Sequence, residues 1–396
     1  SDASHHYRWL IEMDLGILPD DALGTTLEEC AAIQRSTREL ETEATLALLG
    51  AYAGVSALGE RAGAVSAEQL LAALLVPDTL ELASVTPALA LSCVAQVQLR
   101  RQVLGDVTGP AALLSEFVKG FGERGPRERE PAEPRWSETP QRLQRLVEVL
   151  MRADPELAEA RLAGSRRDRR EVIERVLLAC GPLEALAFRT LLGSVHELLT
   201  LRSRLHRVRA RTLAMLRMAV LDVDRRLLRL MGATPGSAFF LKLAELLDST
   251  VRPSRELAGR ARERRERWER VAERRAPAAL LGRALVQRAS DALLTGVGVG
   301  GPVVRGRARL AADVDAALLV EPGEVLVMRS LDPGWAPLLL AASAVVTDAG
   351  GVTDEGVMAA CALGVPIVVG AREATQRLFN GDALQVDTRA GTVQRL

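Results

Sequence analysis

The sequence is poor in aromatic residues and lysine, and it carries no net charge. Aromatic residues make up 3% of the chain and hydrophobic residues 48%, so the core must be built mainly from Leu, Ala and Val. Lys119 and Lys242 are the only lysines, so nearly all positive charge is arginine. Because 51 basic residues balance 51 acidic ones, the charge gives no argument for a nucleic-acid partner.

Cysteines are few and far apart, and long apolar runs are absent. The cysteines show no CxxC or Cys/His metal spacing, which predicts reduced thiols and no metal site; they are Cys30, Cys93, Cys180 and Cys361. No apolar run approaches the roughly 20 residues that cross a membrane. The N-terminus shows no basic-then-apolar signal pattern. We therefore expect a cytoplasmic protein that does not bind membranes.

The length of 396 residues predicts two or three domains. Residues 1–275 are rich in Ala, Leu, Arg and Glu with apolar residues at three- and four-residue spacing, which predicts a helical domain. The Gly-, Pro- and charge-rich stretch 120–140 predicts a break, and so a possible division into two subdomains. Turn signals at 232–236 predict a second break.

Two parts of the helical region have a distinct pattern. An apolar stripe over 191–199 predicts one amphipathic helix, and the stripe over 213–230 predicts the next helix. Residues 255–275 interleave acids and arginines. We interpret this segment as a solvated helix held by i,i+4 ion pairs, because its acidic residues would repel the phosphates of RNA.

From about residue 291 the composition shifts toward Gly and Val, and short apolar runs alternate with turns. We predict strands and intervening short helices there. The predicted strands are 303–310, 324–329, 344–349, 366–370 and 383–387, and the predicted helices are 336–343, 354–363 and 371–379. The predicted class is α plus α/β: a multi-helix region, a hinge at 276–290, and a compact α/β domain at 291–396.

Residues 345–371, VVTDAGGVTDEGVMAACALGVPIVVGA, are typical of a strand, a glycine turn, a helix and a second strand. This segment resembles the phosphohistidine swivelling domain of the phosphoenolpyruvate-utilising enzymes, which include phosphoenolpyruvate synthase, pyruvate phosphate dikinase and rifampin phosphotransferase. In that family the histidine that carries phosphate stands four residues after the second glycine. Counting from Gly351, that position is Glu355.

The resemblance extends along the chain from about residue 120 to 396. It includes GVGVGGPVVRGRARL at 296–310, the DPGW turn within 323–351, FGERGPREREPAEPRWSETP at 121–140 and PGSAFFLKLAELL at 235–247. The resemblance implies ligand-binding candidates in the matching segments, which are Arg124, Glu128, Trp136, Asp332 and Trp335. Arg124 and Glu128 have a simpler reading as a helical ion pair, and Asp332 as a turn residue.

In active members, as the resemblance implies, the glycine turn and the helix N-terminus stabilise the phosphorylated imidazole. Here Gly350 and Gly351 would form that phosphate turn, and Thr353 or Asp354 would cap the helix. Capping and the helix dipole explain Thr353, Asp354 and Glu355 without catalysis. Glu355 is the catalytic candidate by position, since a carboxylate can form an acyl phosphate. It would repel an incoming triphosphate, so we expect it to be inactive.

A second departure points the same way. The family has Ala-Arg-Glu after the histidine, with an arginine able to pair with phosphate, and this chain has Ala360-Cys361-Ala362. Cys361 itself reads as a small apolar core residue rather than a nucleophile. Active members also carry an ATP-grasp domain that binds ATP and magnesium. Residues 1–110 show no glycine-rich phosphate loop, so we expect no cofactor on this chain, with ATP and Mg supplied only through a partner.

Three hypotheses follow. The first, which we prefer, is a degenerate family member, on its own a pseudoenzyme, that binds an unknown small-molecule ligand or a partner. The second is one subunit of a split ATP-dependent phosphotransferase that works with an ATP-grasp protein in trans. The third is a ligand-binding helical module with the swivelling domain as a lid, which predicts an apolar pocket within 120–250.

Overall fold

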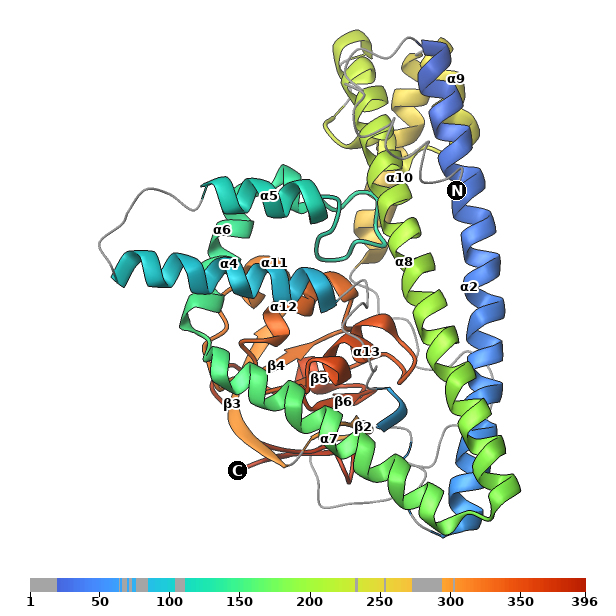
Figure 1. The fold of residues 1–396 in the computed structure, drawn as a ribbon. Helices are drawn as coiled ribbons and strands as arrows, with labels where there is room; N and C mark the ends of the chain where they lie inside the picture. Colours follow the sequence, from blue (N-terminus) through green and yellow to red (C-terminus); the bar gives the residue numbers. More distant parts are fainter. Residues whose placement is uncertain are drawn as a thin grey trace. The chain divides into compact units, whose positions relative to one another are not determined.

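The computed structural model describes residues 20–63, 65, 70, 73–75, 85–103, 111–231, 234–252, 254–272, 294–301 and 303–396. Helices occupy the N-terminal two thirds, and an eight-stranded sheet with short helices follows (Figure 1). The predicted class, α plus α/β, is confirmed. The predicted hinge at 276–290 lies outside the described residues, as do positions 232 and 233 of the predicted break, so the division at 275 and 291 stays a prediction.

The helical part follows the apolar periodicity of the sequence. Its elements are α2 (Asp20–Ala62), α4 (Val85–Val103), α5 (Ala111–Phe121), η2 (Trp136–Glu138), α6 (Pro140–Arg152), α7 (Pro155–Ala179), α8 (Pro182–Met231), η3 (Ser237–Phe240), α9 (Leu243–Val251) and α10 (Arg255–Ala272). Three helices begin with proline, whose fixed φ and missing N–H suit the first helical position. The stretch between α5 and α6 consists of turns and one short 3-10 helix, and the division into two subdomains at 120–140 stays a prediction.

One prediction in this part is wrong. The two apolar stripes assigned to successive helices lie on the single 50-residue helix α8. The sequence from 194 to 231 contains neither glycine nor proline, so nothing in it ends the helix. No described helix combines the length and the apolar character that a membrane span needs.

Contacts divide the chain into two compact units, which are described separately. The smaller unit comprises residues 1–40, 128–134 and 208–280. Its core is formed by Leu23, Leu27, Ala219, Val220, Val223, Leu227, Ala238, Leu241, Leu246 and Ala261. The buried carboxylate of Asp224 accepts hydrogen bonds from the backbone N–H groups of Gly236 (2.7 Å) and Ala238 (2.9 Å), which fixes the turn after α8.

Helix α10 carries the predicted ion pairs. Arg260 pairs with Glu256 and Arg265 with Glu269, both at i,i+4 spacing, which confirms that interpretation. Arg264 also reaches α9, where its Nη2 donates to Oε1 of Glu245 at 2.9 Å. Side-chain hydrogen bonds from Arg264, together with the backbone N–H of Lys242, lower the pKa of Glu245 from 4.5 to about 2.

The larger unit comprises residues 41–127, 135–207 and 281–396 and contains the sheet. The strands are β1 (Leu294–Thr295), β2 (Val297–Val299), β3 (Val304–Ala311), β4 (Val325–Met328), β5 (Ala344–Thr347), β6 (Ile367–Val369), β7 (Ala383–Asp387) and β8 (Thr392–Arg395). The five predicted strands are present as β3 to β7. The sequence analysis missed β1, β2 and β8, which have two to four residues and pair antiparallel with β8, β6 and β7.

Strand order in the sheet is β1-β8-β7-β3-β4-β5-β6-β2, with β3 to β6 parallel to one another. Because these four strands step in one direction, right-handed connections place the intervening helices on one face of the sheet. Those helices are α11 (Val314–Ala317), α12 (Ala336–Leu339), which follows η4 (Pro333–Trp335), and α13 (Glu355–Ala362). A further short helix, α14 (Ala374–Arg377), comes after β6.

Side chains alternate between the two faces as a strand requires. Leu326 and Met328 of β4 belong to the large core that includes residues of α12 and α13, whereas Val325 and Val327 belong to a second core. The large core continues into the N-terminal helices, where α4 contacts α12 and α7 contacts α13 (Figure 1). The helix-bearing face of the sheet is thereby buried within the larger unit.

Candidate functional site

The glycine turn follows β5 at the carboxyl edge of the parallel strands, the edge at which α/β sheets bind ligands. Hydrogen bonds tie the residues after β5 to both neighbouring strands. The N–H groups of Asp348 and Ala349 donate to the carbonyls of Met328 (3.1 Å) and Arg329 (2.9 Å). On the other side, the N–H of Arg372 donates to the carbonyl of Asp348 at 2.9 Å. The turn therefore starts from a fixed backbone.

Gly350 and Gly351 form the predicted turn, and its hydrogen bonds are internal. Gly350 has a φ of 131°, a region that favours glycine. The carboxylate of Asp354 accepts a hydrogen bond from the N–H of Gly351 at 3.0 Å, and the N–H of Asp354 donates to the carbonyl of Gly351 at 3.0 Å. The Gly351 N–H group, one of those that a phosphate at this turn would need, is thus already bonded to a carboxylate.

Asp354 and Thr353 do not act as the helix cap in the usual way. Asp354 occupies the N-cap position of α13, but its side chain accepts no hydrogen bond from the first turn of the helix, because it binds Gly351 instead. Thr353 is half-buried and offers its backbone carbonyl to Arg202. A catalytic role for Thr353 or Asp354 stays a prediction.

Glu355 is the first residue of α13, and it is buried against an arginine of α8. Its side chain is 2% exposed and that of Arg202 is 6% exposed, with Arg202 Nη2 4.0 Å from Glu355 Oε1. Arg202 Nη2 also donates to the carbonyl of Thr353 at 2.9 Å, and Nη1 contacts Sδ of Met358 at 3.6 Å. The Arg202 guanidinium therefore contacts Thr353, which precedes α13, and both Glu355 and Met358 within the helix.

The sequence analysis missed Arg202, although a local signal exists. Val195, Leu199, Arg202 and His206 are spaced by four, three and four residues, and all four are buried. Arg202 thus lies on the apolar stripe of α8, where an arginine needs a buried partner. The identity of that partner depends on packing between α8 and α13, more than 150 residues apart, which no local pattern reveals.

The surroundings of this ion pair are buried and contain further polar atoms. Burial raises the pKa of the Tyr52 hydroxyl, an effect that the charge of Arg202 opposes and that of Cys361 reinforces, so these groups lie near one another. Burial also raises the pKa of Cys361 to about 12, which agrees with its interpretation as a core residue. Among the described residues, Glu355 Oε1, Arg202 Nε, the Tyr52 hydroxyl and Thr347 Oγ1 are buried without a hydrogen-bond partner.

The upstream candidates Arg124 and Trp136 are joined by a backbone hydrogen bond, and the DPGW turn packs against the same segment. The N–H of Trp136 donates to the carbonyl of Arg124 at 2.8 Å, and the side chain of Trp136 is buried. In the DPGW turn, the carboxylate of Asp332 accepts from the N–H of Gly334 at 3.0 Å. A Cβ atom on Gly334 would stand 1.8 Å from the carbonyl oxygen of Gly125. The segment at 121–125 and the DPGW turn thus pack together without space for a side chain.

These contacts show that the candidates stabilise the fold, and they do not test ligand binding. Arg124, Trp136 and Trp335 are buried, and Asp332 is partly buried. Glu128 is also buried but belongs to the smaller unit. Their role in binding a ligand stays a prediction. Across the described ranges, no three His, Cys, Asp or Glu side chains gather where they could hold a metal ion.

Two family models match this chain. Residues 320–391 match the mobile domain of the PEP-utilising enzymes, and residues 56–203 match the fourth domain of rifampicin phosphotransferase. The resemblance derived from the sequence is confirmed over these segments: one is similar to the fourth domain of rifampicin phosphotransferase and the other to the mobile domain of the PEP-utilising enzymes. The second match also begins earlier than expected, because residues 56–119 carried no recognisable motif.

Individual relatives match about a quarter of the chain. It is 41% identical over 104 residues to the phosphoenolpyruvate synthase of Aeropyrum pernix, covering 26% of this chain and 13% of that protein. It is 38% identical over 106 residues to the rifampicin phosphotransferase of Streptomyces sviceus, covering 27% and 12%. It is 39% identical over 92 residues to the chondramide synthase of Chondromyces crocatus, covering 23% and 2%. The matches thus span about an eighth or less of these relatives.

Proposed function

We propose that this chain is a degenerate relative of phosphoenolpyruvate synthase and rifampicin phosphotransferase that carries no phosphate at position 355 and acts by binding a ligand or a partner protein. The observation that carries the proposal is the burial of Glu355 against Arg202, with side chains 2% and 6% exposed. Under this proposal Glu355 accepts no phosphate, whether the nucleotide is bound by this chain or by a partner.

The chemistry of phosphoryl transfer explains why this geometry is unfavourable. A carboxylate oxygen of Glu355 would have to attack a phosphorus of the ATP triphosphate in line, form an acyl phosphate and release the rest of the nucleotide. The attacking oxygen must then meet a bulky, negatively charged group, yet Glu355 is buried. The Arg202 guanidinium lies 4.0 Å from Glu355 Oε1, and the Gly351 N–H is bonded to Asp354.

The alternative is a subunit of a split ATP-dependent phosphotransferase that works with a separate ATP-grasp protein. The intact glycine turn and the match to phosphoenolpyruvate synthases over the mobile domain favour it. Under this alternative a residue of this chain accepts phosphate from the partner, and ATP and magnesium bind the partner. Both functions are compatible with this fold. They differ in whether a residue of this chain becomes covalently phosphorylated.

Intact mass measurement separates the two. The full chain is incubated with ATP and magnesium, alone and with an ATP-grasp protein that phosphorylates a histidine-containing mobile domain, which serves as the positive control. We expect no added phosphate on this chain. A phosphate mapped to Glu355, Asp354 or another residue, and lost on substitution of that residue, would establish the split enzyme and overturn the proposal.

A further inference from the structure

The α/β part of the larger unit contacts the N-terminal helices at three separate places. At the first, Nη1 of Arg161 on α7 donates to the carbonyl of Ala342 at 2.9 Å. Close to it, a Cβ atom on Gly364 would stand 2.7 Å from the carbonyl oxygen of Arg161. At the second, Gly334 packs against the backbone of Gly125. Backbones that approach this closely require a fitted interface.

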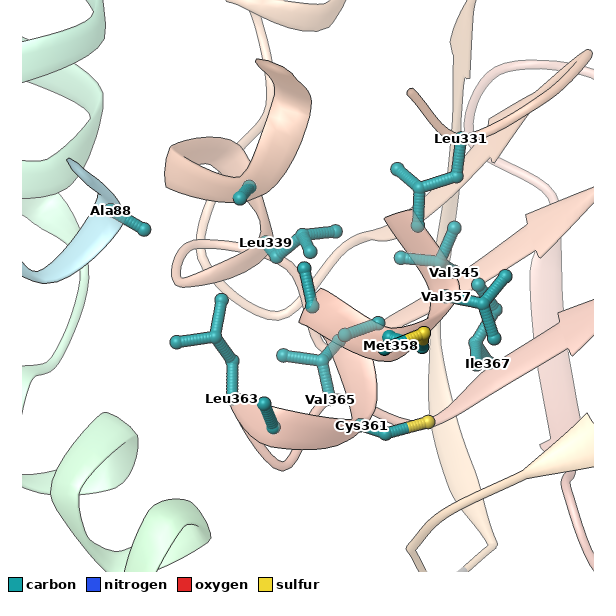
Figure 2. Packing of buried hydrophobic residues seen from close by; sticks show 14 of the residues in the cluster. Ala88, Leu331, Leu339, Val345, Val357, Met358, Cys361, Leu363, Val365 and Ile367 are labelled. Atoms are coloured by element: carbon teal, nitrogen blue, oxygen red, sulfur yellow. The ribbon is translucent and has the colours of Figure 1, made fainter. Parts of the chain in front are cut away.

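Between these places the apolar core is continuous. Residues of α2, α4, α6 and α7 belong to the same buried cluster as residues of α12, α13, β5 and β6. Figure 2 shows Leu339 and Leu363 between Ala88 of α4 and the strand residues Val345 and Ile367. Separation of the α/β part from the helices would expose this apolar surface to water, which is unfavourable.

The third place is the ion pair of Arg202 and Glu355. Arg202 comes from α8 and Glu355 from the start of α13, so the pair joins the two parts of the unit. If the two parts separated, both charges would return to water. If only one charge were removed, the other would remain buried without compensation, which is strongly destabilising. The contact is therefore sensitive to the charge at both positions.

We propose that Arg202 and Glu355 hold the α/β part against the N-terminal helices as a fixed interface, so that the carrier position serves as a contact between domains. This inference departs from the expectation of a swivelling domain. It rests on the proposed function in one respect, namely that Glu355 does not accept phosphate. The two can fail separately, because phosphorylation changes the mass whereas separation of the domains exposes buried groups.

The native cysteines offer a direct test in the full chain. Cys361 on α13 and Tyr52 of α2 belong to the same buried cluster, so Cys361 becomes accessible when the interface opens. Cys93 is exposed and serves as the positive control, and Cys30 is buried in the smaller unit and reports unfolding of that unit. Labelling with a maleimide, followed by peptide mass analysis, gives the rate at each cysteine. We expect rapid labelling of Cys93 and protection of Cys30 and Cys361 in the unaltered chain.

The variants Glu355→Gln and Arg202→Gln should label Cys361 at least about tenfold faster, with Cys30 still protected. The matched control Glu171→Gln removes an exposed ion pair with Arg167 on α7 and should leave Cys361 protected. Unchanged labelling of Cys361 in both interface variants would overturn the inference. The exchanged pair Arg202→Glu with Glu355→Arg separates loss of this contact from unfolding of the larger unit: recovery of Cys361 protection supports the interface, and its absence overturns it.

Discussion

A carboxylate and an imidazole differ in two ways that matter at position 355. An ionised carboxylate carries a negative charge, whereas a neutral imidazole carries none and can act as a nucleophile. Arg202 lies 4.0 Å from Glu355 in a buried site, so the local environment suits the negative group. An imidazole at this position would leave the guanidinium without a compensating charge, and phosphate transfer would start from a destabilised fold.

We therefore expect Glu355→His to lower the free energy of unfolding by about 3 kcal/mol, the cost of breaking a buried pair. We also expect it to gain no phosphate from an ATP-grasp donor, because Cys361 still replaces the arginine of the family. Urea unfolding and intact mass measure the two effects. The exposed-pair variant Glu171→Gln, which should change stability by less than about 1 kcal/mol, is the control. Robust phosphohistidine formation would show that the histidine alone was missing.

The glycine turn gives a second prediction, with a matched control one residue away. Gly350→Ala should destabilise the chain by about 1–3 kcal/mol, because φ is 131° and the added Cβ would lie 3.2 Å from Asp354 Oδ2. Gly351→Ala should be close to neutral, because its φ is not positive and no atom lies within 4 Å of its Cβ. Urea unfolding of both variants measures the difference. Equal losses would mean that the turn does not impose this requirement.

Local motifs identified part of this site, and long-range packing supplied the rest. Gly350, Gly351 and Glu355 were placed correctly on a turn and a helix start because their spacing is contained in one short segment. The sequence analysis could not find the contact of Glu355 with Arg202, because its two residues are 153 positions apart. The hydrogen bond from the Gly351 N–H to the Asp354 carboxylate was missed for a different reason. From the sequence, the same carboxylate could equally well have capped the helix.

At the scale of elements, the contact between α9 and α10 depends on one carboxylate. Glu245 accepts hydrogen bonds from Arg264 and from the backbone N–H of Lys242, which lower its pKa to about 2. The unfolded chain, with an ordinary pKa of 4.5, binds more protons between these values. Stability from this contact is therefore fully present above about pH 4.5 and is lost as the pH falls toward 2.

The consequence is a pH-dependent effect of Glu245→Gln. We expect the variant to be less stable than the unaltered chain at pH 6 and the difference to shrink progressively below pH 4.5, because protonation of Glu245 makes the two side chains similar. Urea unfolding at several pH values measures the difference. Glu256→Gln, at an exposed position of α10, is the control. A difference that stays constant down to pH 3 would contradict this assignment.

Element types were easier to predict than element limits. Runs of apolar, mostly β-branched residues between turn residues identified β4 to β6, because buried parallel strands have this composition. Helix α8 was divided in two, because its stripe was read as two short patterns although no residue interrupts it. The short antiparallel strands β1, β2 and β8 are defined by their pairing with β8, β6 and β7, which no local pattern contains.

At the scale of the whole molecule, the two contact units have separate cores. The smaller unit is built around Leu227 and its neighbours, and the larger unit around the cluster that includes Val345. Separate cores allow one region to open while the other stays closed. Each unit contains a buried cysteine, Cys30 in the smaller and Cys361 in the larger, so the opening of each can be followed independently.

Leu227→Ala should make the smaller unit open more often without affecting the larger one. Leu227 is fully buried, and its truncation should cost about 2–5 kcal/mol. We expect faster maleimide labelling of Cys30 and unchanged labelling of Cys361. The companion variant Val345→Ala should have the opposite pattern. Equal acceleration at both cysteines in either variant would show that the two units open as one.

The carboxylate of Asp354 has a consequence for any anion that reaches the turn. Because it is three residues from the Gly351 N–H that it binds, its effective concentration there is on the order of millimolar or more. A free phosphate ester must displace this tethered competitor, and it must do so beside a second carboxylate at position 355. Under the proposed function, the Asp354 carboxylate would act as an internal competitor for phosphate at this turn.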